Sequence, residues 1–442
     1  MSFISEILTT NPIQLFKNET VRKNLINSFY YFGGTFLQFI IAIFTQPIFS
    51  RYLELKDFAT IGYFAAIQNL IYPLFSMSLP FYYMAQYWKN TDETNGHKNL
   101  SFIINFLNIS NGIIAVVSFI LISLYFKIAN VVFPLTPFIF IVIANLIFEK
   151  YKTYYLLECR IQRQGLRFFL LNLMQIVVNT AFSLFFVVSL NGGAIGRMSG
   201  TLMGIAFLGI ISIALLIKEK KYKISLKIDW VQVKPALKYC IPLIIGAYAY
   251  YPIGNIDSLL LERLGDVSEF GYYNIGLTIS GFAGTFFLAF YQSFEPDLYK
   301  LIAQKRYKKY ILVVLFYIAV LAALSLLFIL TSKPIVSFLT AGRFAKASIY
   351  ANIFIIGIFF MQVGGIFEQL FTAFGKTKLV MWRNILMGVF CVIMYYSMIA
   401  KYQFYGANIT RVITSLFYLI SGAIMFLIYS KTILKEREYK NF

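Results

Sequence analysis

The stretch NSFYYFGGTFLQFIIAIFTQPIFSRYLELKDFATIGYF, from Asn27 to Phe64, contains the pattern that decides the fold class. Its first part belongs to an apolar run over residues 25–49, which is long enough to cross a hydrocarbon core of roughly 30 Å as a helix. A short polar loop with Arg51 and Asp57 follows, and a second apolar run begins at Phe58. The stretch therefore predicts two transmembrane helices joined by a short polar loop.

The same alternation of apolar runs and short polar breaks continues along all 442 residues. Hydrophobic residues make up 59% of the chain and charged residues 13%, whereas soluble proteins usually have about 45–50% and about 25%. Windowed hydropathy predicts spans at 25–49, 58–81, 100–125, 131–156, 168–190, 194–217, 239–261, 270–291, 310–330, 348–374, 379–399 and 404–429. We therefore expect an all-α polytopic membrane protein of about twelve transmembrane helices.

The longest polar connector, residues 218–238, divides the predicted spans into two sets of about six. The predicted organisation is a leader without a secretory cleavage site, an N-terminal lobe, a cytoplasmic linker, a C-terminal lobe and a cytoplasmic tail, at 1–24, 25–217, 218–238, 239–430 and 431–442. Even-numbered halves share one orientation, so the two six-helix bundles would be related by a pseudo-two-fold axis along the membrane normal, with a substrate path between them. A weak similarity between Tyr52–Ile61 and Arg263–Tyr273 favours such a duplication.

Basic residues give the chain a formal net charge of +20, but they follow the topology of the spans rather than forming one surface for nucleic acid. Most of them fall on the side that is cytoplasmic if the N-terminus is inside, which predicts N-in and C-in topology. Arg383 is included in one of these cytoplasmic groups, together with Lys376 and Lys378.

Polar residues recur at helical spacing inside two of the predicted spans. Asn27 and Gln38 share one face of the span at 25–49, and Asn274, Thr278 and Thr285 share one face of the span at 270–291. These faces should avoid lipid. One interpretation is close packing between helices, and the other is a hydrated vestibule lined by amides and hydroxyls. Ile40 and Phe287, on other faces of the same two spans, are expected to face lipid.

Charged residues inside or near the ends of the spans form a second signal, because a charge at the centre of a membrane helix normally faces a cavity or a partner. Arg51, Arg197 and Arg411 fall toward the outer side and are candidate ligands for an anionic cargo, since guanidinium binds phosphate through a fork of donors. Asp257 is a candidate ion-pair partner of one of these arginines or a coupling site for H⁺ or Na⁺, and Glu368 is a second candidate of this kind.

A cluster of charges at Glu149, Lys150 and Lys152 lies about one turn from the predicted inner end of its span. Lysine at such a depth can extend its ammonium group to the membrane surface at little cost, and Glu149 can pair with Lys152 three residues later. The sequence therefore favours a structural role for this cluster.

Signals of enzymatic chemistry are absent from the sequence. It contains no Walker loop, no dinucleotide-binding fingerprint and no HExxH, and its one histidine, His97, lies in a polar segment. The three cysteines are widely separated and have no metal-ligand spacing. We therefore expect no catalytic residues, no metal site and no cofactor.

Two segments resemble a known family, the polysaccharide-transport branch of the multidrug, oligosaccharidyl-lipid and polysaccharide exporter superfamily, typified by Wzx-type O-antigen flippases. Asn27–Phe64 is similar to the opening G…P…sRyLg…dFG of that family, and NIDSLLLERLGDVSEFGYYNIG, from Asn255 to Gly276, is similar to n.Dr..l..lg…vG.Y. Glu54 and Ala59 stand where glycines are expected, and Ser258 replaces a frequent arginine, so no arginine role carries over to position 258.

The resemblance implies two bundles that alternate between inward-open and outward-open states around a cationic cavity in a bacterial inner membrane. The cargo would be a polyprenyl-pyrophosphate-linked oligosaccharide, with membrane lipids, a polysaccharide polymerase and a chain-length regulator as candidate partners. A multidrug or small-metabolite antiporter of the same fold is the alternative within the superfamily. A membrane-embedded polysaccharide polymerase or a scaffold for envelope assembly is the alternative outside it.

Overall fold

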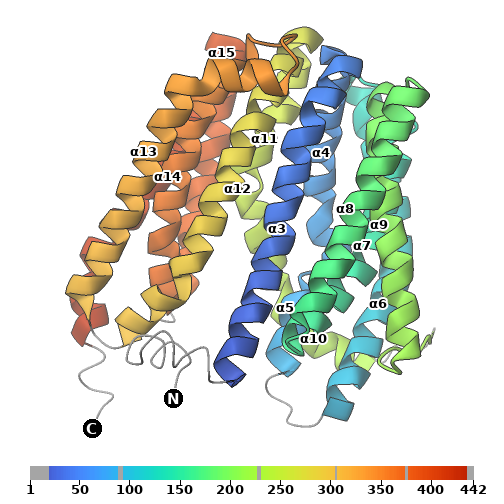
Figure 1. Ribbon diagram of the computed structural model, residues 1–442, viewed down its shortest axis with the longest axis vertical. Coiled ribbons are helices and arrows are strands. Elements are labelled where there is room, and N and C mark those ends of the chain that lie inside the picture. The colour runs from blue at the N-terminus through green and yellow to red at the C-terminus, as the bar shows by residue number, and fades with distance from the viewer. Residues whose placement is uncertain (1–18, 88–92, 226–229, 304–305, 374–376, 436–442) are drawn as a thin grey trace. The chain divides into compact units, whose positions relative to one another are not determined.

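The computed structural model describes residues 19–87, 93–225, 230–303, 306–373 and 377–435, and all regular structure in these ranges is helical (Figure 1). The helices of the first half are α3 (Glu19–Tyr52), α4 (Leu55–Ser76), α5 (Leu79–Tyr87), α6 (Glu93–Ala129), α7 (Phe138–Ile161), α8 (Gly165–Leu184) with a π-helical turn at Phe185–Ser189, and α9 (Gly193–Lys218). Those of the second half are α10 (Trp230–Tyr250), α11 (Pro252–Leu261) with a 3-10 turn at Glu262–Leu264, α12 (Val267–Ala303), α13 (Tyr307–Leu339), α14 (Ala347–Ala373) and α15 (Thr377–Lys435).

Each predicted span overlaps a helix, which confirms the all-helical character, but three predicted segments have wrong boundaries. The segment predicted at 58–81 continues past the end of α4 at Ser76 and into α5, with Met77 and Ser78 at positive φ between the two helices. The segment predicted at 131–156 becomes helical only at Phe138, because Pro134 and Pro137 interrupt the chain before it. The segment predicted at 239–261 belongs to two helices, since α10 already begins at Trp230 and Pro252 starts the separate helix α11.

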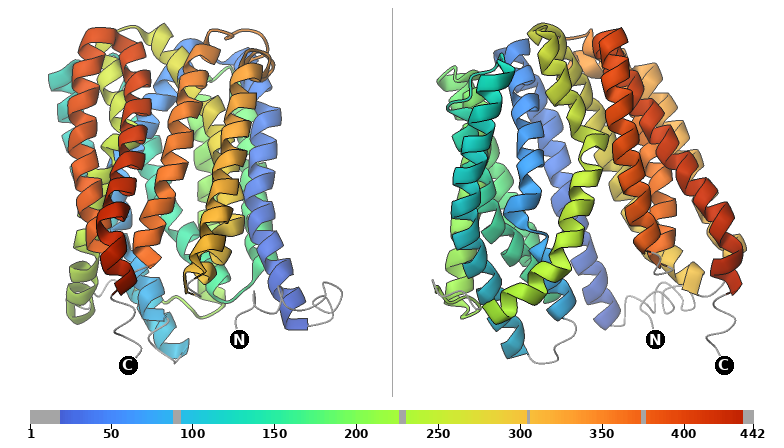
Figure 2. Two further views of the ribbon diagram at one scale, coloured as in Figure 1. Left: turned by 90° about the vertical axis from the view of Figure 1, so that its left-hand side faces the viewer. Right: turned by 180° about the vertical axis from the view of Figure 1, so that it is seen from behind.

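The long helix α15 contains the reversal expected between the last two predicted spans. Gln403 has a positive φ of 50° and is not helical, so α15 consists of two helices on either side of it. Its two halves lie side by side (Figure 2), with the rings of Phe390 and Phe417 stacked 4.2 Å apart. Gly406 allows the close approach at the turn, because a Cβ there would lie 2.1 Å from the carbonyl oxygen of Met398.

Seven helical stretches among the described residues are long and apolar enough to cross a membrane. They are Leu55–Ser76, Leu100–Ala129, Gly165–Ser189, Gly193–Lys218, Lys308–Leu339, Ala347–Glu368 and Lys378–Ile428, the last of which contains the reversal at Gln403. The total of about twelve spans stays a prediction.

The chain divides into two compact units, each of which combines separate parts of the sequence. Unit 1 contains the chain up to Thr45 and Ile71–Ile244, and unit 2 contains Gln46–Leu70 and the chain from Ile245 onward. These boundaries differ from those of the two consecutive lobes, so the predicted division into 25–217 and 239–430 remains a prediction.

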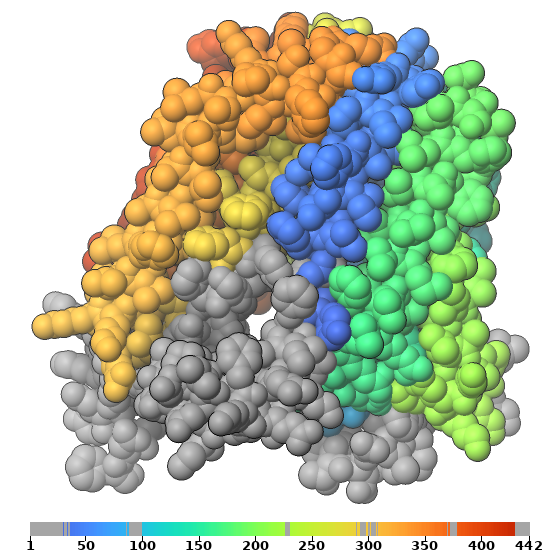
Figure 3. All heavy atoms as spheres, in the orientation of Figure 1, coloured from blue at the N-terminus to red at the C-terminus, as the bar shows by residue number. Residues whose placement is uncertain are grey.

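Unit 1 is organised around α7, which packs against α6, α8 and α9. The side chains of α8 and α9, in two shades of green, interlock on the face shown in Figure 3. The first residues of the predicted linker also pack here: the Asn105 side chain donates to the carbonyl of Lys223 at 2.9 Å and accepts from the Tyr222 hydroxyl at 2.9 Å.

Unit 2 is organised around α14, which packs against α12, α13 and α15. The first part of α4 belongs to the same unit: the Tyr251 hydroxyl donates to the carbonyl of Ala66 at 3.1 Å, and Gly271 of α12 lies against the backbone of Leu55. This close approach requires glycine at position 271, because a Cβ there would lie 2.4 Å from the carbonyl oxygen of Leu55.

Proline occurs at each of the three places where a helix passes from one unit to the other. Pro47 lies just after Thr45 in α3, Pro73 lies just after Leu70 in α4, and Pro242 lies just before Ile244 in α10. Proline removes a backbone donor and disturbs the preceding turn, so these are the positions at which each helix bends most easily.

Candidate functional site

The candidate site in unit 2 is centred on an ion pair between α11 and α15. Nη2 of Arg411 lies 3.1 Å from Oδ2 of Asp257. The Asp257 side chain is completely buried, and that of Arg411 is 14% exposed. Pro252 at the start of α11 sets the beginning of this helix, so Asp257 falls in its second turn, on the side that packs against α15.

Several further contacts hold both members of the pair. The Tyr273 hydroxyl of α12 donates to the same Asp257 oxygen at 2.5 Å, and the backbone N–H of Ser258 donates to the other oxygen at 2.9 Å. Arg411 donates to the carbonyl of Gly254 at 2.6 Å and lies over the ring of Phe354. The carboxylate thus has three donors, as a buried anion requires.

A smaller share of the hydrogen-bonding groups has a partner in the Arg411 guanidinium than in the Asp257 carboxylate. Nη2 of Arg411 makes two contacts and the Tyr395 hydroxyl also interacts with the guanidinium, but Nε has no close hydrogen-bond partner among the described residues. Guanidinium has five N–H donors in a rigid fork. Arg411 therefore keeps donors for an additional acceptor, while Asp257 has little capacity left.

A polar contact joins α4 to the turn of α11 that precedes Asp257. The Asn69 side chain donates to the side-chain carbonyl of Asn255 at 2.8 Å, in an exposed position. Gly254 precedes Asn255 and has open space where a side chain would start. Sequence reasoning did not select these asparagines, because their contact joins two segments that are 186 residues apart in the chain.

The predicted polar face of α12 has one packed end and one exposed end. Asn274 is buried, and its amide lies directly against Gly62 of α4, where a Cβ would come within 2.0 Å of the amide oxygen. Thr278 and Thr285 are exposed, and each hydroxyl donates to the carbonyl four residues earlier, at 2.8 Å and 3.0 Å. Gly281 between them has open space beside it.

Phe287 was expected to face lipid, and this prediction was wrong. Its side chain is 2% exposed and packs in the core of unit 2 with Tyr317 of α13 and Ile355 of α14. Residue 287 lies about 200° around the helix from Thr285, which is the side that α13 and α14 cover.

Glu368 lies in a second polar cluster, between α14 and α15. Its carboxylate accepts a hydrogen bond from the Tyr418 hydroxyl. The guanidinium of Arg383 lies 3.7 Å from the centre of the Tyr418 ring and donates to the carbonyl of Tyr418 at 2.5 Å and to the hydroxyl of Ser421 at 3.2 Å. Arg383 is 2% exposed and is buried among helices, although the sequence grouped it with the cytoplasmic residues Lys376 and Lys378. The sequence indicated that Arg383 belongs inside a span, because four apolar residues, Leu379 to Trp382, separate it from Lys378.

The remaining candidate residues lie on other helices. Arg51 is exposed at the end of α3, where its backbone carbonyl accepts from Arg343 at 2.6 Å. Arg197 lies on α9 in unit 1 and is partly buried, and Gln38 is exposed on the part of α3 that belongs to unit 1. The side chain of Asn27 lies outside the described residues.

Basic and acidic residues form an ion-pair network at one end of unit 1. Nζ of Lys221 lies 2.8 Å from Glu219 and 3.6 Å from the buried Glu158, and Nη1 of Arg167 lies 2.6 Å from Glu219. Burial alone would raise the pKa of Glu219, but hydrogen bonds from Lys221 and Tyr155 and the nearby positive charges lower it below its ordinary value. These charges thus fix the ends of α7, α8 and α9 to one another.

No protein-family model matches the sequence, and no curated protein sequence matches it. Solved structures do match it over nearly the whole chain. The lipid II flippase MurJ in an inward closed conformation has a TM-score of 0.66 at 16% identity, covering 92% of this chain and 89% of that one.

Two transporters of the MATE family are similar as well. The Vibrio cholerae transporter VcmN, in the form of a single-site mutant, has a TM-score of 0.58 at 15% identity and covers 94% of this chain and 97% of its own. An inward-facing multidrug resistance transporter of the MOP superfamily has a TM-score of 0.54 at 11% identity, covering 92% and 96%. At these identities the likeness shows the fold alone, and the chain has the fold that these MATE transporters share with MurJ.

Proposed function

We propose that this protein is a flippase, which moves a polyprenyl-pyrophosphate-linked oligosaccharide across the bacterial inner membrane by alternating access. The MOP fold supports a transporter of either a lipid-linked cargo or a small molecule. The lipid-linked cargo follows from the resemblance of two segments to the polysaccharide-transport branch and from the chemistry of the Asp257–Arg411 pair.

The proposal rests on a difference between the two side chains of this pair: the hydrogen-bonding capacity of Asp257 is used, and that of Arg411 is used only in part. Asp257 is fully buried and already accepts from Tyr273, Ser258 and Arg411. Arg411 is partly exposed, and its five N–H donors outnumber its contacts with Asp257, Gly254 and Tyr395. A phosphate entering unit 2 would find donors at Arg411 and would meet a carboxylate that is already neutralised. Hydrogen bonds to charged groups are worth about 1.5–3 kcal/mol each, which favours an anionic cargo.

The second candidate is a drug or small-metabolite antiporter, which the likeness to MATE transporters favours. A cationic drug would need a carboxylate without a cationic partner, and Asp257 has Arg411 at 3.1 Å. The pair is also a candidate site for coupling to H⁺ or Na⁺, and binding of either ion at Asp257 would require the contact with Arg411 to open.

The topology and partners are part of the same proposal. The excess of Lys and Arg on one side supports N-in and C-in orientation, with residues 218–238 in the cytoplasm. A polysaccharide polymerase and a chain-length regulator are the proposed protein partners, and the protein itself is proposed to transport without catalysing a reaction.

Reconstitution of the purified protein into liposomes tests the cargo class. One set of vesicles contains a fluorescent polyprenyl-pyrophosphate oligosaccharide, and an impermeant quencher added outside reports how much of it has changed leaflet. A parallel set reports uptake of ethidium against a proton gradient. Flipping without ethidium uptake is the expected result, and ethidium uptake without flipping would replace the proposal by the antiporter.

A further inference from the structure

Two asparagines of unit 2 form an amide pair beside a backbone contact of Arg411. Nδ2 of Asn69 on α4 donates to Oδ1 of Asn255 on α11 at 2.8 Å. Asn255 directly follows Gly254, whose carbonyl accepts from Nη2 of Arg411 at 2.6 Å. Two consecutive residues of α11 therefore hold the guanidinium and the amide pair.

The contact between the two amides leaves hydrogen-bonding groups unused. An asparagine side chain has two N–H donors and a carbonyl oxygen with two lone pairs. Asn69 uses one N–H on Asn255, so its second N–H and its carbonyl oxygen have no partner among the described residues. Nδ2 of Asn255 makes only a long contact, 3.4 Å to the carbonyl oxygen of Tyr251 in the preceding turn. Asn69 can therefore both donate to and accept from a further group.

The surroundings of Asn69 favour contact with water or a polar ligand over contact with lipid. The residue lies inside Leu55–Ser76, a helix long and apolar enough to cross a membrane, and its side chain is exposed. An amide in hydrocarbon loses the hydrogen bonds that it would make in water, which is costly. Ala65, one turn before Asn69, is small and exposed, and a Cβ at Gly254 would meet no atom within 4 Å. The pair therefore has open space beside it.

Helix packing is the alternative role for the pair, because asparagines hydrogen-bond across membrane helices. An asparagine that serves packing in the same unit is Asn274, which lies directly against Gly62 and is 5% exposed. Asn69 is exposed instead and keeps an unused donor and an unused acceptor. This difference favours a role in binding.

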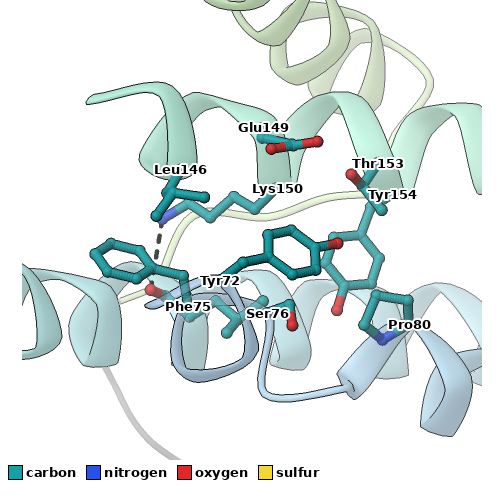
Figure 4. Close-up of a pocket in the computed structure, with 10 residues that line it drawn as sticks. Tyr72, Phe75, Ser76, Pro80, Leu146, Glu149, Lys150, Thr153 and Tyr154 are labelled. Atoms are coloured by element: carbon teal, nitrogen blue, oxygen red, sulfur yellow. Dashed lines mark hydrogen bonds between the residues drawn. The ribbon is translucent and has the colours of Figure 1, made fainter. Parts of the chain in front are cut away.

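A pocket of unit 1, between α4 and α7, is too small to bind a sugar (Figure 4). Its volume is about 20 Å³, which is room for about one water molecule. Lys150 lines this pocket and is 8% exposed, and its Nζ donates to the carbonyl of Leu107 at 3.4 Å, as the dashed line shows. Its ammonium group is buried, so the expectation that it extends to the membrane surface was wrong.

We infer that the Asn69–Asn255 pair binds hydroxyl groups of the sugar next to the pyrophosphate of the cargo. A sugar hydroxyl both donates and accepts, so neighbouring hydroxyls of one ring can accept from the free N–H of Asn69 and donate to its carbonyl oxygen. With phosphate oxygens at Arg411, the first sugar would lie one residue farther along α11, and the two groups are neighbours in the cargo as well. This inference rests on the proposed function and assigns to the pair the preference for a lipid that carries a sugar.

Affinities for two lipids test the inference. Native mass spectrometry of the purified full chain in detergent measures binding of polyprenyl pyrophosphate and of the same lipid carrying one glucose. The native protein should bind the glucosylated lipid about tenfold more tightly, because two hydrogen bonds between neutral groups add an effect of this order. Asn69→Ala and Asn255→Ala should each reduce the preference to about threefold or less and leave the affinity for the sugar-free lipid unchanged.

The matched control is Asn172→Ala, which removes an amide of α8 that donates to the carbonyl of Phe168 in its own helix at 2.8 Å. This variant should keep the full preference for the glucosylated lipid. A pair that only joins α4 to α11 would instead lower the thermal midpoint of the ligand-free protein when it is broken, with the ratio of the two affinities unchanged.

Two results would overturn the inference. One is equal affinity of the native protein for the two lipids, a comparison that needs no variant to fold. The other is an unchanged preference in folded Asn69→Ala or folded Asn255→Ala protein.

The same titrations separate this inference from the proposed function. Tight binding of polyprenyl pyrophosphate with no preference for the glucosylated lipid would reject the amide site and leave the flippase standing. No saturable binding of either lipid would reject both.

Discussion

The guanidinium of Arg411 lies 3.1 Å from the carboxylate of Asp257, and this contact joins α15 to α11 in the interior of unit 2. Asp257→Asn or Arg411→Met alone would leave one charge buried without its partner, which costs about 3–5 kcal/mol. The double variant Asp257→Asn/Arg411→Met leaves no buried charge, and we expect it to be more stable than either single variant. Denaturant unfolding in detergent measures all four free energies.

The matched control for this cycle is Arg51→Met, which removes an exposed arginine and should change the free energy of unfolding by no more than about 0.5 kcal/mol. Strictly additive effects of the Asp257 and Arg411 substitutions would mean that the two side chains do not interact.

A second prediction concerns the contact between Gly62 of α4 and Asn274 of α12. A Cβ at position 62 would lie 2.0 Å from the amide oxygen of Asn274, so Gly62→Ala should destabilise the protein by about 1–3 kcal/mol. Combination with Asn274→Ala should recover most of this loss, because the clashing atoms are removed. Gly281→Ala, with open space at its Cβ, should be neutral or slightly stabilising.

The contact between Gly62 and Asn274 shows which parts of the fold could be predicted from the sequence. The weak similarity between Tyr52–Ile61 and Arg263–Tyr273, extended by one residue, pairs Gly62 with Asn274, and these two residues touch in unit 2. Hydropathy located the helices because span length is a local property. It did not predict that Gln46–Leu70 packs in the same unit as the second half, because that depends on tertiary contacts.

The candidate site could be predicted only in part for the same reason. A charge in an apolar run marks Asp257 and Arg411 as residues that need a partner, but the sequence offered Arg51, Arg197 and Arg411 as equal choices. Burial of Lys150 and Arg383 was missed because depth was judged from distance along the chain to a predicted helix end. Neighbouring helices cover both residues, and single-sequence hydropathy has no information about neighbours.

A third prediction tests whether the exposed face of α12 lines water. Cysteine at Thr285 should react with a small polar thiol reagent in membranes, because this side chain is exposed on the face that carries Thr278 and Gly281. Cysteine at Phe287 should be protected, since that side chain is 2% exposed in the core of unit 2. Cysteine at Gln38, exposed on α3, should react like that at Thr285. Protection at Thr285 equal to that at Phe287 would favour helix packing or lipid contact over a hydrated vestibule.

Arg51 provides a fourth prediction, about transport rather than stability. Its guanidinium is exposed. Nη1 of Arg343 donates to the backbone carbonyl of Arg51 at 2.6 Å, and this hydrogen bond fixes the backbone from which the Arg51 side chain extends. If it contacts the anionic part of the cargo, Arg51→Ala should abolish most flipping at unchanged abundance, and Arg51→Lys should retain part of it because lysine keeps the charge but loses the fork. Lys333→Ala, at an exposed lysine of α13, should flip normally. Normal flipping by both Arg51→Ala and Arg411→Ala would remove the cationic-cavity hypothesis.

The fifth prediction uses the ion-pair network of unit 1, where Lys221, Arg167 and Tyr155 surround Glu219. Burial would raise the pKa of this carboxyl, but these donors and charges lower it below its ordinary value in the folded protein. A depressed folded-state pKa stabilises the protein above the unfolded-state value of about 4.3, and this stabilisation is lost as the pH falls through the folded-state pKa. The thermal midpoint of Glu219→Gln should therefore lie below that of the native protein near pH 7, and the difference should shrink toward about pH 3. Glu54→Gln, at an exposed glutamate, corrects for loss of a carboxyl at the surface. A Glu219→Gln difference that stays constant over this pH range would show that the network stabilises unit 1 by packing and not by charge.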